Sequence, residues 1–239
     1  MATREEILGK IRNAQQQYPQ SLPLPDPPQV WPVQGAAPDE LLAQFEQSLA
    51  AVAGECRRCA DRADAAAQIA EVLKSVETNA GVAGTETAFR WGVRSGELTE
   101  ALADAAAPLL GERGAVRVTA PANPEDADPK ELESISASLI PAEFLLADTG
   151  SAVVRSKSAF DRLMNYLSPV CLIAAKKSQL REHLPHAWPE LLAQIASPGQ
   201  ASGEFLLMTG PSRTADIEKI LILGVHGPKK VVVFVIENE

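Results

Sequence analysis

The chain has 239 residues, 46% of them hydrophobic, which is enough apolar side chain to bury the core of one or two domains. The net charge of -9 at pH 7 makes nucleic acid an unexpected partner, because an acidic surface repels phosphate backbones. Three cysteines do not make a disulfide framework, and neither a signal peptide nor an apolar run of the ~20 residues that span a membrane is visible, so we expect a cytoplasmic protein.

The amino-terminal segment predicts a helix on an extended arm. Thr3 and Glu6 have the spacing of a capping box, and an apolar stripe behind them predicts a helix to about Gln17. Seven prolines follow between residues 19 and 38, and proline fixes φ and removes an amide donor. We therefore expect two parts, residues 1–38 as a helix and proline-rich arm and residues 39–239 as one α/β domain.

Short apolar segments alternate with helical patterns after Pro38, which is placed to be the first residue of a helix. Strands are expected at about 55–59, 115–119, 152–155, 169–174, 204–208 and 231–236. Further helices are expected at about 61–76, 97–107, 160–167, 177–183, 188–196 and 214–223. This alternation predicts an open, mostly parallel sheet with helices on both faces. In such sheets, ligands bind beyond the carboxyl ends of the strands.

The segment from Gly210 to Thr214 follows a predicted strand and is expected to open a helix. Gly210 permits a tight turn, Ser212 or Thr214 can cap the helix, and Asp216 suits its positive end. Free amides, hydroxyls and Arg213 together would make an anion site. The same residues also fit a capped helix in which Arg213 pairs locally.

The segment Gly224-Val225-His226-Gly227-Pro228 places a histidine between two glycines. Glycine lets the backbone approach a ligand closely, and a histidine there can transfer a proton or donate a hydrogen bond. The alternative is a helix that ends at Gly224, followed by a turn that stops at Pro228.

A third polar segment, Asp148-Thr149-Gly150-Ser151, stands just before a predicted strand. These residue types are common in turns, and they can also offer a carboxylate and hydroxyls to a polar ligand.

In this order and spacing, the three segments resemble the LUD domain, and the helix and proline-rich arm in front make the chain similar to the lactate-utilization protein C branch of that family. The resemblance covers nearly the whole chain. It implies a fold like the NagB/RpiA/CoA-transferase group and a role beside two iron–sulfur subunits in oxidising L-lactate to pyruvate in bacteria. It implies no set of catalytic residues. From their chemistry, the expected contacts to a small carboxylate or phosphate ligand are Asp148, Thr149, Ser151, Gly210, Ser212, Arg213, Thr214, Gly224, His226 and Gly227.

No cofactor or metal is expected in this chain. Cys56 and Cys59 have CxxC spacing, but no second pair and no nearby histidine accompany them, and an iron–sulfur cluster takes about four cysteine ligands. Iron–sulfur clusters are therefore expected only in the partner subunits. We therefore interpret the chain as a subunit of an oxidoreductase assembly that itself holds no cofactor. The chain can also form a homo-oligomer.

Two other function classes stay open. One is an independent acyl or CoA transferase, or a ligase-like enzyme of the same fold, in which Glu86 is the candidate nucleophile. The other is a regulatory or scaffolding module. The catalytic candidates are His226, Asp216 and Glu86. No nucleophile in the sequence has an evident base beside it.

Overall fold

The computed structural model describes residues 3–17, 33–76, 89–113, 115–121, 128–196, 203–215 and 221–239. The chain divides into two compact units, Met1–Pro32 and Val33–Glu239. The first contains helix α1 (Arg4–Gln17). At its start, the Thr3 amide donates to the Glu6 carboxylate at 2.8 Å, and the Glu6 amide donates to Thr3 Oγ1 at 3.3 Å. The predicted capping box and the helix behind it are confirmed.

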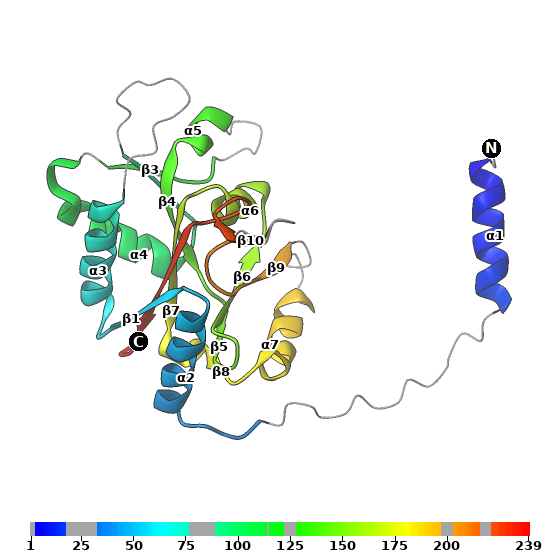
Figure 1. Cartoon of the computed structure of the whole chain (residues 1–239), viewed down its shortest axis with the longest axis horizontal. Helices are drawn as coiled ribbons and strands as arrows, with labels where there is room; N and C mark the ends of the chain where they lie inside the picture. Colours follow the sequence, from blue (N-terminus) through cyan, green and yellow to red (C-terminus); the bar gives the residue numbers. More distant parts are fainter. Residues whose placement is uncertain are drawn as a thin grey trace. The chain divides into compact units, whose positions relative to one another are not determined.

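The second unit is built on a sheet of six strands that are all parallel (Figure 1). In sheet order they are β1 (Glu55–Cys59), β12 (Lys230–Ile236), β7 (Val170–Lys176), β4 (Ile135–Pro141), β2 (Arg90–Val93) and β3 (Val116–Val118). This confirms the predicted α/β fold with an open, mostly parallel sheet. The sequence pattern does not single out β4, along which serine alternates with apolar residues although all but its last residue are buried.

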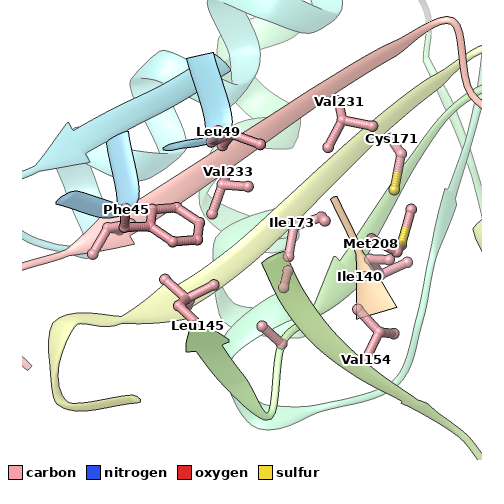
Figure 2. Packing of buried hydrophobic residues seen from close by; sticks show 14 of the residues in the cluster. Phe45, Leu49, Ile140, Leu145, Val154, Cys171, Ile173, Met208, Val231 and Val233 are labelled. Atoms are coloured by element: carbon pink, nitrogen blue, oxygen red, sulfur yellow. The ribbon is translucent and has the colours of Figure 1, made fainter. Parts of the chain in front are cut away.

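Helices cover both faces of this sheet. Successive residues of a strand point to opposite faces, so Val232 and Phe234 pack with α3 (Arg62–Ser75) and α4 (Glu97–Ala106). Val231 and Val233 pack with α2 (Pro38–Ala51) and α6 (Ala159–Tyr166). Figure 2 shows Phe45 of α2 beside Val233. Burial on both faces explains why β12 is a continuous apolar run.

A second, mixed sheet of four strands lies over the face that α2 covers. Its order is β8 (Leu180–Arg181), β5 (Phe144–Leu146), β6 (Ser151–Ser156) and β9 (Glu204–Met208). Leu145 and Val154 point into the core shared with the parallel sheet (Figure 2). Phe144 and Val153 point the other way and pack with Leu191 of α7 (Leu184–Ala196). The domain is therefore layered around two sheets.

The remaining elements are short. They are η1 (Ala107–Arg113), α5 (Pro129–Glu133), η3 (Lys177–Gln179), and an antiparallel pair of strands, β10 (Arg213–Ala215) and β11 (Leu221–Leu223). None of the helices that the structure describes is long and apolar enough to cross a bilayer.

Two predicted helices are wrong, and strand pairing is found in both segments. Residues 177–183 form η3 and β8, and the carbonyl of Arg181 accepts the Ala147 amide at 2.9 Å. Residues 214–223 contain β10 and β11, in which Thr214 faces Ile222. A local apolar period does not reveal strand pairing, because a short apolar segment fits either a helix or a strand and tertiary contacts decide between them.

Candidate functional site

The loop after β9 and the loop after β11 are joined into one unit. The Ser212 amide donates to the Pro228 carbonyl at 2.8 Å, and the Gly224 amide donates to the Ser212 carbonyl at 2.9 Å. A Cβ on Gly227 would lie 3.2 Å from the Ser212 Cβ, so the two backbones are close. We call residues 210–213 and 224–228 the paired loops. The structure thus brings together two of the three segments that the sequence singles out.

The paired loops lie at the amino edge of the parallel sheet. The amides of Lys229 and Lys230 both donate to the Pro169 carbonyl, at 2.8 and 3.1 Å. Pro169 directly precedes β7, and Lys230 is the first residue of β12. This edge is opposite to the carboxyl edge, where ligands usually bind in open α/β sheets.

The third polar segment, Asp148–Ser151, is held against α2. Ser151 Oγ lies 2.6 Å from Thr209 Oγ1, which is next to the paired loops. Gly150 has φ +64°, and a Cβ on it would lie 2.3 Å from the backbone nitrogen of Leu49. Asp148 and Thr149 are exposed. The glycine of this turn is therefore needed for close packing on α2.

The polar side chains of the paired loops face solvent. Arg213 and His226 are exposed, and His226 borders a hollow of about 370 Å³ that Tyr166 and Lys229 also line. No hydrogen bond or ion pair joins Arg213 to His226 in the part of the chain that the structure describes. The helix start predicted for this segment is wrong, because Arg213–Ala215 form strand β10. Ligand contact by the side chains of the three segments stays a prediction.

Two of the catalytic candidates, Asp216 and Glu86, lie outside the described residues. Their placement relative to His226 therefore stays untested.

A cavity of about 340 Å³ opens at the carboxyl edge of the sheet, and we call it the carboxyl-edge cavity. Its wall comes from the ends of β2, β4 and β7, from β6, and from the starts of α4 and α6. The charged residues that line it are Arg94, Glu97, Glu143, Arg155, Lys157, Asp161 and Lys176. Sequence reasoning singles out none of them. The available signal is the polar Ser95-Gly96 pair between a buried strand and a helix, at the place where the rule for open sheets expects a ligand.

Arg94 is one of the two most enclosed cations that line this cavity. It is 5% exposed and follows β2 directly. Its Nη1 donates to Asn165 Oδ1 at 3.4 Å, Nη2 donates to the Arg155 carbonyl, and Nε lies 3.4 Å from Asp161 Oδ1. Burial lowers the pKa of Arg94, and the negative charge of Asp161 opposes that effect. A guanidinium stays protonated in proteins, so a positive charge is fixed in the wall.

Asp161 is already engaged on its other oxygen. Its Oδ2 accepts the backbone amides of Lys157 at 2.8 Å and Ser158 at 3.2 Å, as the first-turn partner of the α6 cap. The aspartate therefore orients Arg94 and caps α6, and its charge is largely compensated by these donors.

A family model described as the LUD domain matches residues 42–236. The chain belongs to the LUD domain family. A lactate utilization protein C of Bacillus pumilus is 30% identical over 107 residues, which are 45% of each chain. A protein of Escherichia coli named YkgG is 32% identical over 109 residues, covering 45% of this chain and 47% of that protein. The chain thus matches these curated relatives over about half of their length.

A crystal structure extends the likeness to the fold. The DUF162 family protein of Deinococcus radiodurans superimposes with a TM-score of 0.55 over 84% of this chain and 99% of that protein, at 16% sequence identity. The resemblance predicted from the three polar segments is confirmed.

The CxxC cysteines of this LUD domain do not face one another. Cys56 packs against the cluster that contains α2, whereas Cys59 lies in the cluster that contains α3, on the opposite face of the sheet. Burial raises the pKa of each thiol to about 12, so Arg57 and Arg58 do not activate them. Two side chains on opposite faces of a strand cannot ligate one ion. Within the described residues, no three His, Cys, Asp or Glu side chains are grouped to hold a metal.

Proposed function

We propose that the chain is a cytoplasmic subunit of a bacterial lactate-utilization system that supports oxidation of L-lactate to pyruvate together with iron–sulfur partner subunits. The observation that carries this proposal is the match of residues 42–236 to the LUD domain. Relatives named lactate utilization protein C connect this domain with the use of lactate. The curated names belong to those relatives, and their activity is transferred here as a proposal.

The cysteines support a division of labour. Oxidation of lactate to pyruvate releases two electrons, which need a redox centre that accepts them. The chain has three cysteines, and Cys56 and Cys59 point to opposite faces of the sheet, so they do not form a cluster-binding set. We therefore assign electron transfer to the partner subunits. To this chain we assign the binding of substrate or of partners.

The experiment is a deletion of the gene in its host, followed by complementation with the tagged chain. We expect the deletion to abolish growth on L-lactate, the complemented strain to grow, and iron–sulfur proteins to co-purify with the tag. Normal lactate consumption in the deletion strain, or a tagged chain that is recovered alone from cells growing on lactate, would contradict the proposal.

The paired loops are proposed to contact a ligand or a partner subunit of that assembly. Arg213 and His226 are exposed there on a backbone that hydrogen bonds fix, which is a suitable arrangement for recognition. Complementation with Arg213→Gln and with His226→Gln tests this role, and Lys130→Gln, at an exposed position of α5, is the matched control. We expect the first two variants to slow growth on lactate at normal protein levels. Wild-type growth of both would leave the loops with a structural role only.

A further inference from the structure

We propose that the carboxyl-edge cavity binds the carboxylate group of a small organic acid. The site itself rests on the geometry of the cavity, and only the choice of lactate and pyruvate as acids rests on the proposed function. The cavity lies at the opposite edge of the sheet from the paired loops, so the two candidate sites can be tested separately.

A buried cation in the wall is the first support. A guanidinium has five N–H donors. In the described part of the chain, Arg94 uses Nη1 on Asn165 and Nη2 on the Arg155 carbonyl, while its Nε is near Asp161 without a hydrogen bond. A buried charge needs compensation by an opposite charge and by hydrogen bonds. An anion in the cavity would add both.

The start of helix α4 is the second support. Gly96, Glu97 and Leu98 line the cavity, and Gly96 occupies the N-cap position. Glycine has no side chain to accept the first-turn amides, and no other side chain of the described residues does so. The helix therefore presents free amide donors and its positive end to the cavity, which is an arrangement that binds carboxylate and phosphate groups.

The charge balance of the wall is the third support. Four basic and three acidic residues line the cavity, although the whole chain has a net charge of -9. Asp161 pairs with Arg94 at 3.4 Å, and Glu97 pairs with Arg62 at 3.1 Å. Among the bases, Lys176 pairs with Glu239 at 3.1 Å. The ammonium group of Lys157 has no ion-pair partner among the described residues. Lys157 is therefore the cation best placed to meet an incoming anion at the mouth of the cavity.

The size of the cavity fits this ligand class. Its volume of about 340 Å³ lies at the lower end of the range for small-molecule pockets, roughly 300–1,000 Å³. Arg155 lines the same wall and is 5% exposed, with its guanidinium carbon 5.6 Å from the ring centre of Phe205. The enclosed Arg94 guanidinium and a helix start thus border one space of suitable volume.

Calorimetric titration of the purified full-length chain with L-lactate, pyruvate and inorganic phosphate tests the proposal. We expect lactate or pyruvate to bind, and Lys157→Gln to weaken the binding roughly tenfold, with recovery in Lys157→Arg. Lys229→Gln, beside His226 at the paired loops, is the matched control and should bind like the wild type. Weaker binding in Lys229→Gln with wild-type binding in Lys157→Gln would move the ligand to the paired loops and overturn the proposal.

A second pair of variants separates binding from folding. Gly96→Asp places a carboxylate at the N-cap, where it can accept the first-turn amides itself, and the nearest atom to its Cβ is the Thr99 hydroxyl at 3.1 Å. We expect unchanged or higher thermal stability together with loss of acid binding. Gly96→Asn caps without a charge and should weaken binding less. Equal, unchanged binding in both variants would exclude the helix start from the site.

The remaining outcomes are also decisive. Binding of phosphate without lactate or pyruvate would overturn the assignment to organic acids. No binding of any of the three probes at millimolar concentration would overturn the site, while growth and co-purification would still decide the proposed function independently.

Discussion

The carboxylate of Glu182 accepts the backbone amide of Gly35 at 2.6 Å, although 147 residues separate them along the chain. The same carboxylate accepts the amides of Gln34 at 2.6 Å and Ala36 at 3.1 Å. These bonds, that of Gln34 foremost, hold the pKa of Glu182 below its ordinary value, against the opposing effect of burial. One side chain thus fixes the segment that leads into α2.

We expect Glu182→Gln to lower the free energy of unfolding by about 2 kcal/mol near neutral pH, because a neutral amide replaces a charged acceptor of three N–H groups. The pKa of Glu182 is lowered in the folded protein, so its contribution is present above the unfolded pKa near 4.5 and is lost as the pH falls through the folded pKa. Urea denaturation should therefore show a gap between wild type and variant that closes in acid.

The control for this prediction is Glu190→Gln, which removes an ion pair with Arg181 in which Glu190 is 51% exposed. Its cost should stay below about 1 kcal/mol. A gap for Glu182→Gln that does not change with pH would contradict the role assigned to the charge.

Gly150→Ala should destabilise the domain more than Gly111→Ala. Both glycines have positive φ, +64° and +61°, so alanine adds about 1–3 kcal/mol of backbone strain at either position. A Cβ at Gly150 would also lie 2.3 Å from the Leu49 nitrogen, whereas a Cβ at Gly111 meets nothing within 4 Å. We expect a total loss of about 3 kcal/mol or more at Gly150, measured by chemical denaturation. Equal losses of stability in the two variants would show that α2 moves to make room for the added methyl group.

The three thiols should react slowly with a disulfide reagent in the native protein. Burial raises the pKa of Cys56, Cys59 and Cys171 to about 12, and the thiolate is the reactive form. Labelling at mildly alkaline pH should be fast in urea and slow without it, with the half-buried Cys56 reacting first. Native labelling at the rate of a free thiol would contradict the described burial.

Arg94 and Asp161 should be energetically coupled. Their side chains are 6% and 13% exposed, and removing one charge of such a pair leaves the other uncompensated. We expect Arg94→Met to cost about 3–5 kcal/mol and a double-mutant cycle with Asp161→Asn to give a coupling of more than about 1 kcal/mol. Independent, additive losses in urea denaturation would contradict the pairing. This cost is the reason for probing the cavity with Lys157 and Gly96 instead.

Local signals in the sequence predict elements whose causes are local. The structure has three such elements: the capping box at Thr3, the helix start at Pro38 and the apolar run of β12. The residues that produce each of them lie close together in the sequence. The helix predicted over 214–223 fails because Thr214 pairs with Ile222 in a strand ladder. The strand β4 escapes notice because its serines are satisfied inside the domain, as when Ser168 Oγ donates to Ser138 Oγ at 2.7 Å.

By itself, the sequence determined the α/β class, the parallel sheet, the amino-terminal helix and, through three polar segments, the LUD family. The tertiary structure decided which residues share a site. It placed the paired loops at the amino edge, put Cys56 and Cys59 on opposite faces, and gathered Arg94, Lys157 and Lys176 around one cavity. The physical reason is that parallel strands bring their carboxyl ends to one edge whatever their order in the chain, so residues far apart in sequence meet there.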